Sequence, residues 1–185
     1  MRSLSLSRRQ VLGSLASGTL LGLSGCGKAE PARPGARALA AVQSHVESIN
    51  IYGSEAEFLK SFAAAPPRVG HLIAVFWCDA EVCNGGFDQF FLNSTGVLAP
   101  EAVLGFRAIG LPECADLVET AIGKFPPPYP RDRERRDRAL NALSGSGPKG
   151  HEGNLFYDLE DLYYAARDRG KFDAVMDAYA QQLGT

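Results

Sequence analysis

The apolar residues of this chain recur at steps of three and four, and no segment alternates apolar and polar residues as a half-buried strand does. Leu39, Val42, Val46 and Ile49 show this helical step first, and it returns in later segments up to the C-terminus. Such a step places an apolar stripe on each helix, which a helical domain buries against its neighbours. We therefore predict an all-α fold, with a single compact multi-helix domain over residues 39–185.

Local signals mark where several of these helices begin. Ser54 followed by Glu57 forms a capping box, so a helix should open there and end before the next proline pair. Pro100 and Pro112 each stand where a first helical turn would start, and apolar residues at helical spacing follow both. Between these helices, the apolar block at residues 72–77 predicts a largely buried helix at the centre of the core.

The C-terminal part begins with a charged segment, residues 131–138, in which arginines alternate with acidic residues. Such a pattern is typical of a solvated helix face. A loop rich in glycine and serine follows at residues 144–153. The apolar steps beyond it predict two more helices that meet around Gly170.

The N-terminal segment resembles an export address. Arg8 and Arg9 precede a modestly apolar stretch, which is similar to a twin-arginine signal, and the Leu-Ser-Gly-Cys sequence ending at Cys26 resembles a lipobox. We expect residues 1–25 to be the signal peptide and residues 26–38 to be the lipidated cysteine and a flexible tether. The domain would then be lipid-anchored in the cell envelope, at the periplasmic face of the outer membrane. A plain signal peptide and a cytosolic amphipathic helix are the alternatives.

Three cysteines remain if Cys26 carries lipid: Cys78, Cys83 and Cys114. The five-residue step from Cys78 to Cys83 turns them roughly 140° apart on one helix, which is too divergent for a disulfide. We therefore expect buried thiols. A later bridge from either cysteine to Cys114 is the alternative.

Residues 81–96 carry the most distinctive pattern of the chain. Its Asn-Gly-Gly turn can adopt positive φ, which closes one helix and directs the chain into the next. Three phenylalanines then share one helical face, and two amide side chains four residues apart share another, where they can bond the backbone or each other. The motif residues are Asn84, Gly85, Gly86, Phe87, Gln89, Phe90, Phe91, Asn93 and Gly96.

This pattern resembles the signature of a family of small helical domains, described as of unknown function, that also forms the C-terminal domain of a bacterial DNA-mimic protein. The resemblance extends over about residues 45–180 and includes the Pro-Arg-Asp-Arg stretch at residues 130–133. Cys83 stands where the family would have a second asparagine. The resemblance implies a helical domain that presents carboxylates, as substitutes for phosphates, to a basic DNA-binding partner.

The distribution of charge disfavours direct binding of nucleic acid. Three of the 19 basic residues and none of the 21 acidic ones precede Cys26, so the remaining chain carries a net charge of −5. The last two predicted helices carry a candidate acidic interaction face, which should mostly face water and attract a basic partner. Its residues are Glu160, Asp161, Asp168, Asp173 and Asp177.

Residue patterns for catalysis or metal binding are sparse. The three histidines lack the spacing of a metal site, and neither a nucleophile elbow nor a phosphate-binding loop is present. We therefore expect no metal, no cofactor and no enzymatic activity. Asp79, Glu81 and Asp88 flank the Asn-Gly-Gly turn and could form a carboxylate cluster for acid and base catalysis. The interpretation that we favour is that Glu81 and Asp88 cap or solvate neighbouring helix ends.

Three functional hypotheses follow. The preferred one is a non-enzymatic envelope lipoprotein whose domain binds an unknown protein partner. The second is a cytosolic DNA mimic that occupies a basic DNA-binding protein, and the third is an enzyme that uses the region Asn84–Gly96. A homodimer is a further option for the assembly.

Overall fold

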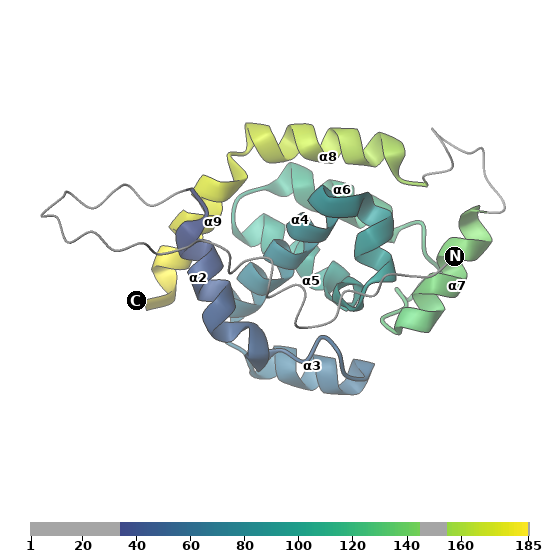
Figure 1. Cartoon of the computed structure of the whole chain (residues 1–185), viewed down its shortest axis with the longest axis horizontal. Coiled ribbons are helices and arrows are strands. Elements are labelled where there is room, and N and C mark those ends of the chain that lie inside the picture. The colour runs from purple at the N-terminus through teal and green to yellow at the C-terminus, as the bar shows by residue number, and fades with distance from the viewer. Residues whose placement is uncertain (1–33, 145–154, 185) are drawn as a thin grey trace, which may run out of the picture. The chain divides into compact units, whose positions relative to one another are not determined.

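The computed structural model describes residues 34–144 and 155–184, and over these ranges it contains eight α-helices and no β-strand (Figure 1). The all-α prediction is confirmed. The α-helices are α2 (Ala36–His45), α3 (Glu55–Ala64), α4 (Pro67–Leu92), α5 (Ala99–Ala108), α6 (Pro112–Ile122), α7 (Arg133–Ser144), α8 (Tyr157–Arg169) and α9 (Phe172–Ala180). The same ranges hold the 3-10 helices η1 (Val46–Ser48), η2 (Ser94–Leu98) and η4 (Gln181–Gly184).

The expected export and lipidation residues Arg8, Arg9 and Cys26 lie outside the described residues, so these three assignments stay predictions. Residues 36–38, which were expected in the tether, form the first turn of α2. Within residues 34–144 and 155–184, none of the helices combines the length and the apolar character that crossing a membrane requires.

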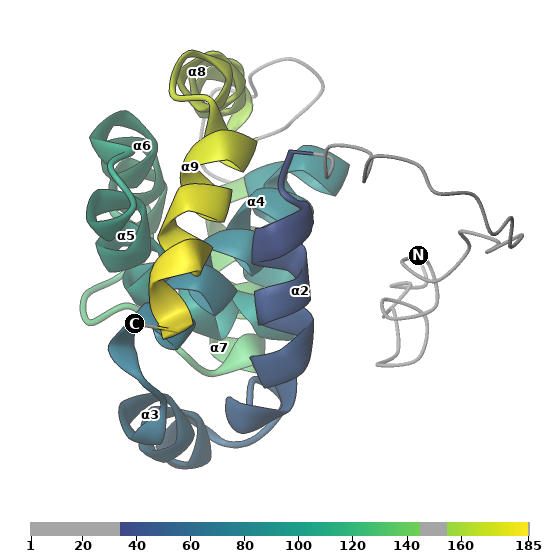
Figure 2. The same ribbon diagram turned by 90° about the vertical axis from the view of Figure 1, so that its left-hand side faces the viewer.

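The helix α4 is the element around which the others pack. It contacts α2, α5, α7, α8 and α9, and Figure 2 shows it between the α5–α6 pair and α2. Leu72, Ile73 and Val75 in its first half are at most 1% exposed. The prediction of a buried helix at the centre of the core is therefore confirmed.

The second half of α4 joins the core to α8 through aromatic rings. Phe87, Phe90 and Phe91 have no exposed surface, as expected for one apolar face. The ring centroid of Phe87 lies 5.8 Å from that of Phe156, just before α8, and 5.6 Å from that of Tyr163 within it. These separations are typical of favourable aromatic pairs, so the phenylalanines of the motif serve the core.

The predicted helix starts are confirmed. The backbone N–H of Glu57 donates to the Ser54 hydroxyl, and the backbone N–H of Ser54 donates to the Glu57 carboxylate at 2.7 Å, which completes the capping box of α3. Pro100 and Pro112 stand in the first turns of α5 and α6. The missing N–H of proline leaves no donor unpaired at such a position.

Hydrogen bonds join the first helix of the domain, α2, to the last, α9. The carboxylate of Asp177 in α9 accepts hydrogen bonds from the backbone N–H groups of Gly35, Arg37 and Ala38, at 2.9, 3.0 and 2.9 Å. It thereby caps the N-terminus of α2, where the helix dipole favours a negative charge. Asp177 therefore has a structural role and does not belong to a free acidic surface.

Two details differ from the periodicity-based prediction. The first expected helix, which was to continue to Ile49, ends as an α-helix at His45 and tightens into η1. The turn between α8 and α9 places Lys171 in the left-handed region, with φ of 52°, whereas Gly170 keeps a helical conformation.

Candidate functional site

The polar side chains of the motif converge on Glu81. Its carboxylate is 9% exposed and accepts hydrogen bonds from Gln89 Nε2 at 2.6 Å, Asn93 Nδ2 at 2.8 Å and Thr95 Oγ1 at 3.0 Å. Asn84 Nδ2 donates in turn to the Gln89 amide oxygen at 3.1 Å. The prediction that Gln89 and Asn93 bond the backbone or each other, and that Glu81 caps a helix end, is wrong. One buried carboxylate, which precedes the turn, instead binds three donors that follow it.

The turn between the two halves of α4 depends on Gly86. Its φ is 75°, a conformation that side chains disfavour, and a Cβ there would collide with the Glu160 carboxylate of α8. Gly85 is non-helical, with φ of −159° and ψ of 27°, so of the two glycines only Gly86 has the expected positive φ. The backbone N–H of Phe87 donates to Glu160 Oε1 at 2.9 Å. Glu160 therefore caps the second half of α4.

This contact corrects the prediction for Glu160. The residue is 8% exposed and faces the turn of α4, although it was expected on a water-facing acidic surface. No local pattern could reveal the contact, because Phe87 lies 73 residues away.

Arginines from the charged segment close the other end of the motif. Arg136 has no exposed surface, and its guanidinium donates to the carbonyls of Phe91 and Asn93, at 2.8 Å each, and of Arg131. Burial lowers the pKa of Arg136. Arg133 Nε donates to the Leu92 carbonyl at 2.7 Å. The prediction of a solvated face is therefore wrong for Arg136, which satisfies carbonyls that the end of α4 leaves unpaired.

A second arginine contact holds the segment after the motif. Arg131 forms a bidentate ion pair with Glu101, at 2.7 and 2.8 Å, and donates to the Val97 carbonyl at 2.7 Å. Tyr129 donates its hydroxyl to the Gly96 carbonyl at 2.8 Å. Gly96 is required here because a Cβ would lie 2.7 Å from the Phe90 carbonyl oxygen. These contacts assign the last motif glycine to close packing.

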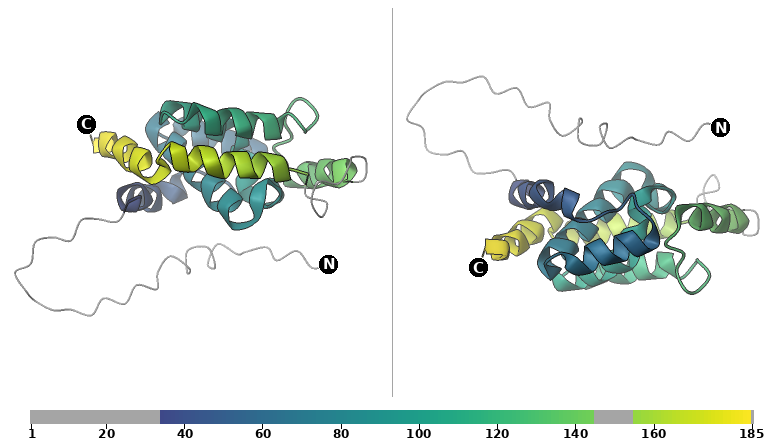
Figure 3. Two further views of the ribbon diagram at one scale, coloured as in Figure 1. Left: turned by 90° about the horizontal axis from the view of Figure 1, so that it is seen from above. Right: turned by 90° about the horizontal axis from the view of Figure 1, so that it is seen from below.

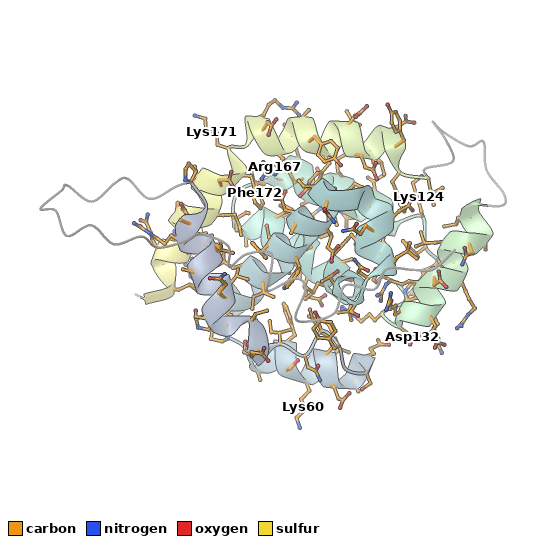
Figure 4. All side chains as sticks on the ribbon, in the orientation of Figure 1. Lys60, Lys124, Asp132, Arg167, Lys171 and Phe172 are labelled. Carbon is orange, nitrogen blue, oxygen red and sulfur yellow. The ribbon has the colours of Figure 1, made fainter. Side chains whose placement is uncertain are left out.

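Asp79 forms a separate buried polar group with partners from α8. Its carboxylate accepts hydrogen bonds from Arg167 Nε at 2.8 Å and from the Tyr163 hydroxyl at 3.1 Å. Burial raises the pKa of Asp79, and the bonds to Arg167 and Tyr163 oppose that rise. Figure 4 labels Arg167 beside Phe172, whose ring centroid lies 4.7 Å from the guanidinium carbon. Asp79 and Glu81 therefore accept hydrogen bonds from different donors, and the two carboxylates do not form one cluster.

The thiols have environments that disfavour the reactive thiolate. Cys78 and Cys114 are buried as predicted, whereas Cys83 is exposed, which corrects the prediction for that residue. Burial raises the pKa of Cys83 to about 11 and that of Cys114 to about 12. All three cysteines are free thiols. A thiolate is the nucleophilic form, so these values argue against cysteine chemistry at neutral pH.

Six exposed carboxylates lie on α6 and α8, which run side by side (Figures 2 and 3). Arg169 of α8 donates to Glu113 of α6 at 2.6 Å and joins the two helices at one end. Arg107 pairs with both Asp116 and Glu119. We call this surface the α6–α8 acidic face; its residues are Glu113, Asp116, Glu119, Asp158, Asp161 and Asp168.

The predicted acidic face is thus only partly correct. Asp161 and Asp168 are exposed as expected, whereas Glu160 and Asp177 cap helices and Asp173 is half-buried. The three carboxylates of α6 were missed. Their regular step of three residues, opposite the apolar side of that helix, was the signal that could have revealed them.

Neither a metal centre nor an enclosed polar site is apparent among residues 34–144 and 155–184. No three His, Cys, Asp or Glu side chains in that part of the chain are grouped to hold an ion. A hollow of about 740 Å³ lies between the proline-rich segment Pro126–Pro130 and α7. Its lining carries both signs of charge, from Arg131, Arg135 and Arg138 and from Glu55 and Asp132, so it has no clear preference for an anion or a cation.

A comparison with protein families gives a match to the model described as "DMP19-like protein" over residues 63–183. This range includes the motif, the buried carboxylates Asp79 and Glu81, and all six residues of the α6–α8 acidic face. Searches among curated proteins and among solved structures gave no significant match. Because the family model covers more than half of the chain, this protein belongs to the DMP19-like family.

Proposed function

We propose that this protein is a non-enzymatic binding domain, held at the cell envelope by lipid on Cys26, and that its α6–α8 acidic face binds a basic protein partner. The observation that carries the proposal is that some carboxylates are buried and bonded within the fold, whereas others are exposed. Glu81 and Glu160 are bonded within the fold, whereas six carboxylates of α6 and α8 lie at the surface. The motif therefore supports the fold, and the exposed carboxylates supply the recognition chemistry.

The charge density of this face favours a protein surface of moderate positive charge. Asp158 and Asp168 are ten residues apart on α8, which is about 15 Å at 1.5 Å per residue. A DNA duplex carries roughly nine phosphates over that length, at one charge per ~1.7 Å. The acidic face has six carboxylates. Arg107 and Arg169 form ion pairs with the three on α6 and partly neutralise their charge. The attraction should therefore be weaker than that of DNA and sensitive to salt.

The proposal is tested by affinity capture with the full chain and with a triple variant, Asp158→Asn, Asp161→Asn and Asp168→Asn. These three residues are exposed, and Asp158 and Asp161 have no ion pair with any described residue, so their replacement should leave the fold intact. A partner should be captured by the wild-type chain at low salt, and lost with the variant or near 1 M salt, where the Debye length falls to about 3 Å.

A matched control removes the same number of carboxylates elsewhere. Glu55→Gln, Glu134→Gln and Asp137→Asn neutralise three exposed residues on α3 and α7. Capture should survive these changes. Equal loss in both triple variants would mean that net charge alone attracts the partner, and capture by all variants would refute a role for the acidic face.

The anchoring part of the proposal has its own test. Metabolic labelling with a fatty-acid analogue should mark the wild-type chain, and label that persists in Cys26→Ala would contradict lipidation. Export should depend on the twin-arginine pair, so replacing Arg8 and Arg9 with lysine should retain the chain in the cytosol. Unchanged export would point to the general secretion route.

A second candidate function, DNA mimicry, is favoured by the membership of the DMP19-like family and by the position of the acidic face within the matched range. A DNA mimic competes with duplex DNA for a basic DNA-binding protein and acts in the cytosol. Fractionation therefore separates the two proposals. Cytosolic protein that displaces DNA from its partner would support mimicry, whereas envelope-bound protein would support the first proposal.

A further inference from the structure

A second surface hollow, of about 490 Å³, lies where the start of α4 and the end of α5 meet α9. Figure 2 shows α9 beside α5 and α4 at this junction. Apolar and polar side chains both line it, and the polar ones come from three elements. The apolar lining consists of Ala108, Ile109, Val175 and Ala178, and the polar lining of Arg68, Tyr179 and Gln182.

Arg68 is the charged residue that lines this hollow, and one face of its guanidinium lies over an aromatic ring. Its guanidinium carbon lies 5.1 Å from the centroid of the Tyr179 ring, and Nη1 donates to the Gln182 amide oxygen at 2.5 Å. No carboxylate of the described residues pairs with Arg68. A guanidinium has five N–H donors in a planar fork, so most of its donors remain available for a ligand.

A histidine of α4 holds the Tyr179 side chain in place. A hydrogen bond of 2.8 Å joins its hydroxyl to Nδ1 of His71, which is half-buried in α4. Burial, and then the nearby charge of Arg68, lower the pKa of His71, so the imidazole is neutral at pH 7. The hollow therefore carries one positive charge, on a preorganised Arg68, and no negative charge in its lining.

We propose that this hollow binds a carboxylate that carries an apolar body. The carboxylate would accept two parallel hydrogen bonds from the fork of Arg68, and the body would lie against Ile109 and Val175. An arginine that stacks on an aromatic ring and presents its edge suits bidentate recognition of a planar carboxylate. The hollow beside α7 lacks this selectivity because Glu55 and Asp132 also line it.

Two sources can supply such a carboxylate, namely a small organic acid and the free C-terminus of a peptide. Benzoate and the dipeptide acetyl-Gly-Phe, each titrated into the isotope-labelled full chain, represent them. Saturable NMR shifts are expected at Arg68 and Tyr179 with at least one probe. Benzyl alcohol and the amidated dipeptide, which lack the carboxylate, should cause no such shifts. Binding of benzoate alone assigns a small acid and binding of the dipeptide alone assigns a chain terminus, whereas binding of neither overturns the proposal.

The role of the guanidinium is tested with Arg68→Gln and Arg68→Lys. The first should weaken binding at least about tenfold, equivalent to ~1.4 kcal/mol, and the second should be intermediate because lysine keeps the charge but loses the planar fork. Arg138→Gln, which removes another exposed arginine on α7, is the matched control and should bind like the wild type. Equal binding by Arg68→Gln, with a circular dichroism spectrum like that of the wild type, would overturn the proposal. This test does not involve the acidic face, so its failure leaves the proposed function untouched.

Discussion

Removing the carboxylate of Glu81 should destabilise the domain strongly, because three donors depend on it. In Glu81→Ala, the side chains of Gln89, Asn93 and Thr95 lose their shared acceptor. Thr95 is only 4% exposed, so water cannot easily replace that bond. Gln89 and Asn93 are half-buried and can partly recover bonds to water.

The size of the effect follows from these exposures. A buried donor left without a partner costs about 1–3 kcal/mol, and each half-buried amide should lose somewhat less, so the total is roughly 3–5 kcal/mol. Glu81→Gln keeps an amide of nearly the same shape, which can accept from the two amides and donate to the Thr95 hydroxyl. Its loss should be only about 1 kcal/mol, the part that comes from the charge of the acceptor.

Urea unfolding followed by circular dichroism measures these losses. For a protein of this size the loss in Glu81→Ala corresponds to a fall in Tm of roughly 6–20 °C. Glu134→Gln, at a carboxylate whose side chain is 86% exposed, is the control and should stay within about 0.5 kcal/mol of the wild type. A loss below about 1 kcal/mol in Glu81→Ala would refute the structural role assigned to the motif.

Three further predictions concern the turn glycine, the buried arginine and the half-buried histidine. Gly86→Ala should lower the free energy of unfolding by about 2–4 kcal/mol, since it combines a positive φ with a collision against Glu160, and a melting curve like that of the wild type would contradict this. Arg136→Lys should lose about 2 kcal/mol in urea unfolding, because a lysine cannot reach the three carbonyls that the buried guanidinium joins. The NMR titration midpoint of His71 should lie below 6.5 and rise in Arg68→Gln; because the unfolded chain takes up this proton first, the histidine should make stability fall as the pH drops through 6.5.

The helices were predictable from the sequence because their signals are local. The capping box at Ser54 and the prolines at the starts of α5 and α6 act within a single turn of helix. The three motif phenylalanines follow the helical step, so their burial was predictable as well. The family resemblance drawn from the motif is confirmed by the match over residues 63–183.

The polar contacts of the site were not predictable because their partners are distant in sequence. Glu160 meets Phe87 across 73 residues, and Arg136 meets Phe91 across 45. Each looked like one member of a solvated charged segment, since a charge pattern alone does not distinguish an exposed side chain from a helix cap. Only the packing of α7 and α8 against α4 turns these two charges inward.

The central claim is that the motif builds the fold and that the α6–α8 acidic face makes the external contact. The most direct test measures urea unfolding and low-salt capture on the same preparation of the full chain carrying Asp158→Asn, Asp161→Asn and Asp168→Asn. We predict a free energy of unfolding within about 1 kcal/mol of the wild type, since exposed substitutions have small effects, together with loss of the salt-sensitive partner. A stable variant that still captures every partner of the wild-type chain at low salt would contradict the claim.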